Sequence, residues 1–419
     1  MAFVLADFGY NSAWRVAKHV RTTGDINGDK LEDIVGFGDA GVYRSLSTAS
    51  GFGPATFVIA NFGYNQGWRV DRHVRLLADV NGDGRKDIVA FGDAGVWLSL
   101  ATPDGNFTAP AFVLADFGYN QGWTPANHIR TTADVNGDGR QDIVAFGDNG
   151  VYIALSTGTG FGPAQFVLGN FGYLAGGWRV ERHPRLLIDM DRDGRADIVG
   201  FGDAGVWIAH STGSGFASAQ FVIADFGYNQ GWRVDRHPRF VADVNGDGYQ
   251  DIVGYGEDSV YRALGGPGYF GPMQGVLRAL VATAIPLSTR YSPNDIVRTD
   301  LFQRMVGDVT GDGLQDLVAT NDGYLIAAPS SPLPPPPPPD PPTNPRVTAS
   351  TTSSLSIAWT APLPNQKDTR QFFITYYKSG DTSTQTVATS ASYRTYDLKA
   401  LSDQLLFQRP GRKHVGRFV

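Results

Sequence analysis

Residues 62–93 read FGYNQGWRVDRHVRLLADVNGDGRKDIVAFGD, and variants of this stretch recur along the chain. The acidic part, DVNGDGRKD, recurs with its first Asp at positions 25, 79, 134, 189, 243 and 308. Successive copies therefore lie 54, 55, 55, 54 and 65 residues apart. Six copies with a period of about 54 residues are typical of an array, a solenoid or a propeller.

Each unit divides into four short strands. In the second unit they are VRLLADV, DIVAFGD, GVWLSLA and PAFVLAD, separated by NGDG, DAG and a Gly/Pro-containing turn. Val96, Leu98 and Leu100 alternate with Trp97 and Ser99, which is the period of a β-strand. Antiparallel strands repeated in this way predict an all-β, six-bladed β-propeller over residues 1–328.

The two ends of the repeat region complement each other. The sixth unit contains RMVGDV, DLVATND and GYLIAAP but lacks a fourth strand, whereas the chain begins with an orphan fourth strand, AFVLADF. Pairing these segments would close the ring and remove an open sheet edge. We therefore expect the N-terminal strand to complete the sixth blade.

Composition limits the chemistry of this 419-residue chain, which has no cysteine and a formal net charge of −6. Disulfides, thiolate catalysis and cysteine-type zinc sites are excluded, and the charge gives no reason to expect a nucleic-acid partner. No apolar run approaches the roughly 20 residues of a membrane helix, so we expect no membrane span. The start, MAFVLADFGY, lacks the charged region of a signal peptide, and we expect none.

Strand order separates the two motifs of each repeat. The acidic loop joins strands one and two of a blade. The FGYNQGWRVDRH segment joins strand four of one blade to strand one of the next. Because successive connections of an antiparallel meander lie at alternate ends of its strands, we expect acidic loops on one face and Trp/His segments on the other.

The acidic loops have the form D-x-[DN]-x-D-G-x-x-D, with Lys30 replacing the glycine in the first copy and Thr310 standing at the third position in the sixth. Calcium prefers six to eight oxygen ligands, which predicts calcium as the cofactor, bound weakly by the first loop. The alternative is a set of Asn/Asp-Gly hairpin turns with solvated carboxylates. The candidate ligands are Asp25, Asn27, Asp29, Asp33, Asp79, Asn81, Asp83, Asp87, Asp134, Asn136, Asp138, Asp142, Asp189, Asp191, Asp193, Asp197, Asp243, Asn245, Asp247, Asp251, Asp308, Thr310, Asp312 and Asp316.

The connecting segments repeat Trp, His and Arg at fixed positions five times. In one interpretation, Trp packs between blades and His binds the backbone. In the other, these residues and the Asp of FGD line a sugar pocket between blades, with Trp facing the apolar side of the sugar and the polar groups its hydroxyls. The candidate sugar-binding residues are Trp14, His19, Arg21, Asp39, Trp68, His73, Arg75, Asp93, Trp123, His128, Arg130, Asp148, Trp178, His183, Arg185, Asp203, Trp232, His237 and Arg239.

The sixth unit departs from this pattern. It has Val297 and Phe302 where the others have Trp and His, but it keeps Arg304. Trp and His are therefore not required for a blade, and Arg is the best structural candidate of the three. We expect five pockets at most.

The run DFGYNQGWRVDRHPRFVADVNGDGYQDIVGYG resembles the repeat of mushroom propeller lectins of the Psathyrella velutina and Agrocybe aegerita type. The acidic loops resemble the FG-GAP repeats of integrin α-chains. The lectin resemblance covers residues 1–328 and implies glycan partners with terminal N-acetylglucosamine, bound between blades. The FG-GAP resemblance implies structural calcium on the opposite face. An integrin-like protein-binding or adhesion propeller is the alternative.

An enzyme is not expected. Catalytic sites are normally single and asymmetric, whereas each histidine of the connecting segments recurs in nearly the same context. A repeated context is typical of a multivalent binding protein.

Residues 329–345, PSSPLPPPPPPDPPTNP, predict a semi-rigid proline-rich linker. Residues 346–419 contain SLSIAWTAP and FFITYYK, which resemble the first strands of a fibronectin type III domain with Trp359 in its core. The resemblance ends near Leu401, so we expect a partial domain, with a disordered tail as the alternative. The combination predicts a secreted or extracellular protein, although a cytoplasmic lectin stays open.

Overall fold

The computed structural model divides the chain into two compact units, Met1–Pro332 and Leu333–Val419. It describes residues 5, 7–48, 51–257, 259–277, 304–307, 314–321, 324–328, 330, 343–350, 354–360, 371–378, 385–390, 395–399 and 403–407.

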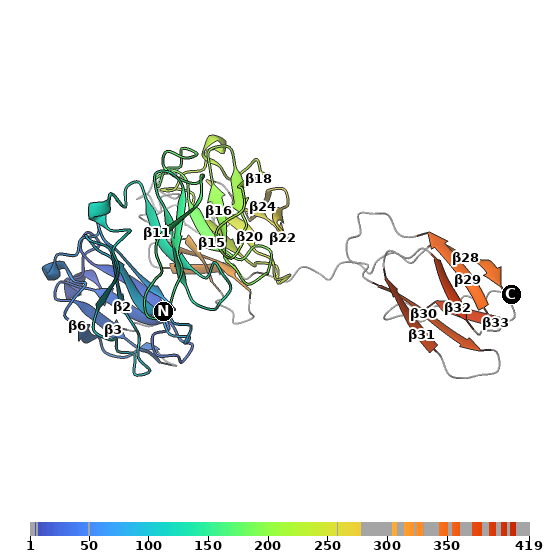
Figure 1. Cartoon of the computed structure of the whole chain (residues 1–419), viewed down its shortest axis with the longest axis horizontal. Helices are drawn as coiled ribbons and strands as arrows, with labels where there is room; N and C mark the ends of the chain where they lie inside the picture. Colours follow the sequence, from blue (N-terminus) through green and yellow to red (C-terminus); the bar gives the residue numbers. More distant parts are fainter. Residues whose placement is uncertain are drawn as a thin grey trace. The chain divides into compact units, whose positions relative to one another are not determined.

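In the first unit, each of the first five repeats forms a four-stranded antiparallel sheet whose strands follow chain order. Figure 1 shows these sheets following one another from the blue N-terminal end to the yellow region. The sheets are, in turn, β1 (Val20–Gly24), β2 (Asp33–Phe37), β3 (Val42–Ser45) and β6 (Thr56–Ile59); β7 (Val74–Ala78), β8 (Asp87–Phe91), β9 (Val96–Ser99) and β10 (Ala111–Leu114); β11 (Ile129–Ala133), β12 (Asp142–Phe146), β13 (Val151–Ala154) and β14 (Gln165–Leu168); β15 (Arg185–Ile188), β16 (Asp197–Phe201), β17 (Val206–Ala209) and β18 (Gln220–Ile223); β19 (Arg239–Ala242), β20 (Asp251–Tyr255), β21 (Val260–Ala263) and β24 (Gln274–Leu277).

The sixth repeat contributes a three-stranded sheet of β25 (Arg304–Gly307), β26 (Asp316–Asn321) and β27 (Tyr324–Ala328). These six sheets are the blades of the expected all-β propeller. The N-terminal strand expected to complete the sixth blade falls largely outside the described residues. Two short hairpins also form, β4 (Ser47–Thr48) with β5 (Gly51–Phe52) and β22 (Gly265–Gly266) with β23 (Tyr269–Phe270).

The helical elements of the described residues are four 3-10 turns. They are η1 (Tyr10–Ser12), η2 (Tyr64–Gln66), η3 (Tyr119–Gln121) and η4 (Tyr228–Gln230). Across the described part of the chain, no helix has the length and apolar character needed to span a bilayer.

The hydrophobic core lies between neighbouring blades. Val35 and Phe37 of β2 pack with Ile88 and Ala90 of β8, and all four side chains are fully buried. Equivalent clusters join the second blade to the third, the third to the fourth and the fourth to the fifth. Because each sheet uses both faces in this way, its second strand is apolar without alternation, as the DIVAF and DIVGF sequences show.

Among the described residues, backbone hydrogen bonds fasten the second to fifth connecting segments to the preceding blade. The N–H of Tyr64 donates to the carbonyl of Gly38 at 3.0 Å, and that of Asn65 donates to the carbonyl of Asp39 at 2.9 Å. The acceptors belong to the turn between the second and third strands of the first blade. The same attachment recurs at Tyr119, Tyr173 and Tyr228.

The acidic loops are fastened to each other at the opposite end of the strands. The N–H of Lys86 donates to the carbonyl of Asp25 at 2.7 Å, and that of Gln141 donates to the carbonyl of Asp79 at 2.7 Å. Neighbouring blades are thus joined at both ends as well as through their shared core.

The second unit contains two three-stranded antiparallel sheets, in agreement with the predicted fibronectin type III-like sandwich. A strand also forms at residues 403–407, beyond the point near Leu401 where the sequence resemblance ends. The sheets are β28 (Thr343–Ser350), β29 (Ser354–Thr360) and β32 (Thr395–Lys399), and β31 (Gln385–Ser390), β30 (Gln371–Lys378) and β33 (Asp403–Phe407).

Replacing Gly63 by alanine should weaken the junction between the first two blades. A Cβ there would lie 2.5 Å from the backbone nitrogen of Gly41 and 2.8 Å from the carbonyl oxygen of Asp39, so the blades must move apart. We expect the free energy of unfolding to fall by about 2 to 3 kcal/mol, measured by chemical denaturation.

Gly67→Ala is the matched control. Gly67 has a φ of 91° and no atom within 4 Å of an added Cβ, and the first blade already carries Ala13 there with a φ of 67°. We expect a loss of about 1 kcal/mol, from backbone conformation alone. Equal effects of the two substitutions would show that the close approach at Gly63 does not control the junction.

Candidate functional site

Each connecting segment begins with a Phe in the left-handed backbone region, which bulky residues rarely adopt. Phe62 has a φ of 64°. Its N–H donates to Asn61 Oδ1 at 2.7 Å, and its carbonyl accepts from Arg75 Nη1 at 2.9 Å. Both backbone groups are therefore held, which stabilises a strained corner. The same conformation occurs at Phe8, Phe117, Phe171 and Phe226.

The tryptophan of each segment is part of the packing between blades. Trp68 is 7% exposed and donates from Nε1 to Asn61 Oδ1 at 3.2 Å. Its ring lies edge-on to Phe62 and His73, with centroid separations of 5.2 and 5.1 Å. This placement agrees with the packing interpretation and leaves little of the indole accessible. Equally buried are Trp14, Trp123, Trp178 and Trp232.

The histidine is held in one tautomer by its neighbours. His73 Nδ1 accepts the backbone N–H of Arg69 at 3.1 Å, so Nε2 carries the proton and donates to Asp93 Oδ1 at 3.0 Å. Burial lowers the pKa of His73, opposed by the hydrogen bond to Asp93, and the pKa of His183 is lowered for the same reason. The ring is therefore a neutral donor near neutral pH.

Each histidine thus orients one carboxylate on the surface. The side chain of Asp93 is 52% exposed although His73 is buried, so its second oxygen faces solvent from a fixed position. The Nε2–Oδ1 distance is 3.0 Å in each of the other pairs with aspartate. They are His19 with Asp39, His128 with Asp148, and His183 with Asp203.

In the fifth blade the acid is Glu257, which the sequence pattern missed because it replaces aspartate. His237 Nε2 lies 3.8 Å from Glu257 Oε1. The spacing could have revealed it, since each histidine precedes its acid by 20 residues.

The segment arginines lie away from the open surface. Arg75 is 3% exposed, and its guanidinium lies 5.5 Å from the ring centroid of Phe37 in the preceding blade. Burial lowers its pKa to about 10. Arg130, Arg185 and Arg239 are buried in the same way, and Arg21 donates to the carbonyl of Phe8 at 2.8 Å.

In the fifth blade a hollow of about 360 Å³ opens beside Trp232, His237 and Glu257, a size within the range of small-ligand sites. Trp232 and His237 both line it, whereas Arg239 does not. Its other lining residues are Asp225, Gln230, Gly231, Gly256, Glu257, Tyr261 and Met273.

Aromatic residues of the third and fourth strands were not among the predicted site residues. Tyr261 of β21 lines the hollow, and an aromatic residue of the third strand occupies the same place in every one of the first five blades. In the first four blades this ring packs edge-on against an exposed phenylalanine of the outer strand. The pairs are Tyr43–Phe57, Trp97–Phe112, Tyr152–Phe166 and Trp207–Phe221. The repeated GVY and GVW tripeptides in the sequence could have indicated the aromatic residues of the third strand.

At the other end of the strands, the acidic loops fold around their own carboxylates. Asp79 accepts the backbone N–H of Gly82 at 2.7 Å and that of Gly84 at 2.8 Å. Asp83 accepts the N–H of Arg85 at 2.9 Å. The backbone therefore holds the carboxylate oxygens toward the inside of the turn.

The last aspartate of each loop is fully buried. Asp87 accepts the N–H of Val80 at 3.0 Å and the N–H of Ala101 at 2.7 Å, which joins the acidic loop to the chain after the third strand. Burial raises its pKa to about 6, and the nearby carboxylates add to this effect. The pKa values of Asp142 and Asp251 are also raised to about 6. Asp33, Asp197 and Asp316 are buried as well.

The donor set fits a calcium ion. In the fourth loop, oxygens of Asp189, Asp191 and Asp193 lie within 4.8 Å of one another. In the other loops of the first five blades an Asn amide oxygen replaces the middle carboxylate, which is also a hard ligand. Arg85 pairs with Asp83, so an ion there would compete with the guanidinium. Asp308, Thr310 and Asp312 lie outside the described residues.

Among solved structures, the chain is similar to an Agrocybe aegerita lectin described for its specific recognition of non-reducing terminal N-acetylglucosamine. The two are 40% identical, the match covers 78% of this chain and 84% of that chain, and the TM-score is 0.70. The chain belongs to the family of this lectin. The expected resemblance to mushroom propeller lectins is thereby confirmed.

Two family models also match, the FG-GAP-like repeat at residues 189–272 and the fibronectin type III domain at residues 340–404. A Photorhabdus luminescens Tc holotoxin pore is 19% identical over 71% of this chain and 13% of that chain, with a TM-score of 0.48. The V. cholerae biofilm matrix protein Bap1 is 16% identical over 93% of this chain and 62% of that chain, with a TM-score of 0.32. Neither adds to the functional assignment. No curated protein sequence matches the chain.

The buried loop aspartates should make stability depend on pH in metal-free buffer. The pKa of Asp87, Asp142 and Asp251 is about 6 in the folded chain, against about 3.9 when unfolded. Between these values the folded state binds more protons, so their contribution to the free energy of unfolding falls as pH rises from about 4 to about 6.

Saturating calcium should flatten this slope, because a nearby cation keeps the carboxylates ionised. Denaturant unfolding of the full chain across this pH range, with and without calcium, measures the difference. Titratable groups away from the loops contribute equally to the pH dependence of unfolding with and without calcium. Identical slopes would mean that no cation binds beside these carboxylates.

Proposed function

We propose that this protein is a multivalent lectin for terminal N-acetylglucosamine or a closely related sugar, with up to five equivalent sites. The observation that carries the proposal is the half-exposed carboxylate of each of the first four blades, hydrogen-bonded to a buried histidine that packs beside a tryptophan. The 40% identity to a lectin that recognises this sugar supports the assignment of ligand class.

The chemistry of the cluster suits a sugar. An ionised carboxylate with one oxygen bound to His73 still offers acceptor positions to ligand hydroxyl or amide N–H groups. Tyr261 and the rim of Trp232 in the fifth blade provide apolar surface for the C–H face of the ring. In this arrangement His positions the acid, Arg supports the corner, and the carboxylate and aromatic side chains contact the ligand.

Repetition supports a multivalent function. A single sugar gains little from each hydrogen bond, because its hydroxyls exchange water for protein. Linked sites can raise the avidity for a surface that presents several sugars by about 10²- to 10⁴-fold. Glycoconjugates outside the cell present sugars in this way, and we propose a secreted or extracellular location.

Calcium in the acidic loops is part of the proposal, with a structural role. The acidic loop follows β7, whereas His73 lies directly before β7, and the other four of the first five blades repeat this order. The loop and the His–carboxylate pair are therefore at opposite ends of the strand, so an ion in the loop would not contact the ligand. Its contribution would be to neutralise the carboxylates that converge within each loop. No step of sugar binding depends on it.

A protein-binding propeller is the second candidate, and a specific observation favours it. Phe57, Phe112, Phe166 and Phe221 are 45–55% exposed on the outer strands of four blades, which is unusual for side chains of this size. A glycan array separates the two functions, because a protein binder should give no signal on it.

Asp93→Ala should remove one sugar site. The substitution takes away the oriented carboxylate but leaves the buried Trp68 and the blade interface in place, whereas Trp68→Ala would cost about 3 to 5 kcal/mol in stability. We expect calorimetry with the monosaccharide to give a stoichiometry lower by one, with unchanged affinity at the remaining sites.

Asp71→Ala is the matched control, since Asp71 is an exposed carboxylate of the same segment. It should bind like the wild type. Combined replacement of Asp39, Asp93, Asp148, Asp203 and Glu257 by alanine should abolish binding to a glycan surface. Full binding by that folded variant, or a wild-type stoichiometry of one, would refute the repeated site.

The second unit should be dispensable for sugar binding, because the carboxylate clusters all lie before Pro332. A chain ending at Pro332, where the first compact unit ends, should match the full chain in calorimetric stoichiometry and affinity. A folded truncation with weaker monosaccharide binding would place part of the site in residues 333–419.

A further inference from the structure

The fourth blade differs from its neighbours at two positions that meet in space. Its acidic loop has Asp191 where the loops of the first, second, third and fifth blades have asparagine. His210, directly before the Ser211 whose N–H binds the last loop aspartate, stands where those four blades have leucine. The replaced residues are Asn27, Asn81, Asn136 and Asn245, and Leu46, Leu100, Leu155 and Leu264.

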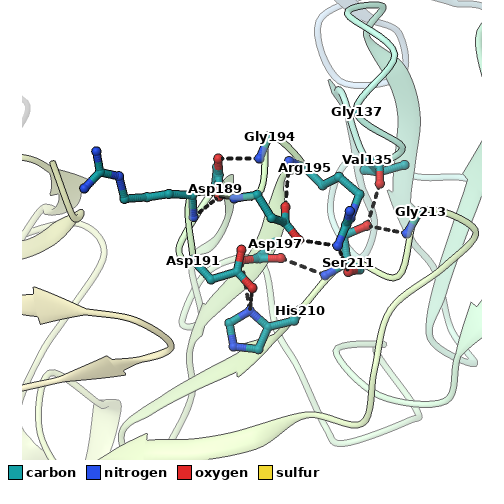
Figure 2. Close-up of polar contacts among 12 residues, drawn as sticks. Val135, Gly137, Asp189, Asp191, Gly194, Arg195, Asp197, His210, Ser211 and Gly213 are labelled. Atoms are coloured by element: carbon teal, nitrogen blue, oxygen red, sulfur yellow. Dashed lines mark hydrogen bonds and ion pairs between the residues drawn. The ribbon is translucent and has the colours of Figure 1, made fainter. Parts of the chain in front are cut away.

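The two exceptional side chains converge on the buried Asp197 (Figure 2). His210 Nδ1 lies 3.0 Å from Asp197 Oδ2 and 3.5 Å from Asp191 Oδ2. Asp197 cannot turn away, because it accepts the backbone N–H of Met190 at 3.1 Å and that of Ser211 at 2.7 Å. The three ligand atoms lie within 4.8 Å of one another.

Asp191 lacks the interaction that its asparagine counterparts make. Asn81 donates from Nδ2 to Asp83 at 2.9 Å, whereas a carboxylate cannot donate to Asp193. Asp191 Oδ1 is buried, and no described residue forms a hydrogen bond with it. Arg195 pairs with Asp193 and therefore does not neutralise Asp191. The fourth blade therefore has the carboxylate of Asp191 facing the imidazole of His210, where the first, second, third and fifth blades have a hydrogen-bonded asparagine amide.

These distances suit a small divalent ion. Zinc binds nitrogen and oxygen at about 2.0 to 2.2 Å, so ligands of a tetrahedral ion stand about 3.4 Å apart. The observed separations from His210 Nδ1 bracket that value. An imidazole ligand also shifts preference from calcium toward zinc, cobalt and nickel. The side chains of His210 and Asp191 are 26% and 33% exposed, which gives an ion access from solvent.

We propose that Asp191, Asp197 and His210 form a transition-metal site specific to the fourth blade, with water completing the coordination of a zinc ion that takes the place of calcium in this one loop. Asp191 lies in the β15–β16 loop, Asp197 is the first residue of β16 and His210 directly follows β17, so the ion would join the acidic loop to the chain after the third strand of the same blade. The site is independent of sugar binding and differs in ligand type from the all-oxygen loops of the neighbouring blades.

Zinc titration of the untagged full chain by calorimetry, in buffer containing excess calcium, tests the site. We expect one zinc ion to bind, and Co²⁺ to give the visible absorption of a four-coordinate ion with a nitrogen ligand. His210→Leu and Asp191→Asn each restore the residue of the neighbouring blades, so both should fold. Each should weaken zinc binding by about 100-fold or more, beyond the effect of losing a supporting group.

Transplanting the site provides the converse test. The double variant Asn136→Asp, Leu155→His in the third blade, which retains Asp142, should raise the zinc stoichiometry to two. Absence of zinc binding by the wild-type chain, or wild-type affinity in His210→Leu, would reduce the cluster to a histidine–aspartate ion pair. Displacement of zinc by calcium would make the fourth loop an ordinary acidic loop.

Discussion

The constraint on which the structure depends is the close backbone contact between one blade and the next. Phe62 adopts a left-handed conformation, Gly63 lies against the preceding turn without room for a Cβ, and Arg75 holds the carbonyl of the corner. Trp68 and His73 are placed by the same corner. The surface carboxylate that His73 orients is therefore positioned by the packing that closes the blade interface, and the histidine–aspartate distance is the same in the first four blades.

The carboxylates at the two ends of each blade lie in different environments. At the acidic loops, backbone N–H groups surround the aspartates, and burial raises the pKa of Asp87. At the connecting segments, Asp93 keeps half of its surface in solvent and accepts from one neutral imidazole. The first arrangement suits a bound cation that stabilises the turn. The second suits a neutral ligand that exchanges with water.

Much of this organisation could be predicted from the sequence, because a repeat exposes which positions stay constant. The strands, the blade count and the candidate Trp, His and loop residues follow from periodicity. The burial of Trp68 could not be predicted, since a packing residue and a binding residue are equally constant among copies. The pairing of His73 with Asp93 needed the fold, although its 20-residue spacing was visible. The contact of His210 with Asp197 and Asp191 also needed the fold, because these partners lie 13 and 19 residues earlier in the sequence.

Neighbouring blades in the described part of the ring share a core, a turn contact and a loop contact, and the stability of such repeats is dominated by nearest-neighbour terms. A substitution in one blade is therefore felt mainly by the two beside it. Because the effect of a substitution stays local, one blade can lose or change its functional side chains while the other blades keep theirs. The unusual pair in the fourth blade and the missing Trp and His of the sixth are changes that such an architecture tolerates.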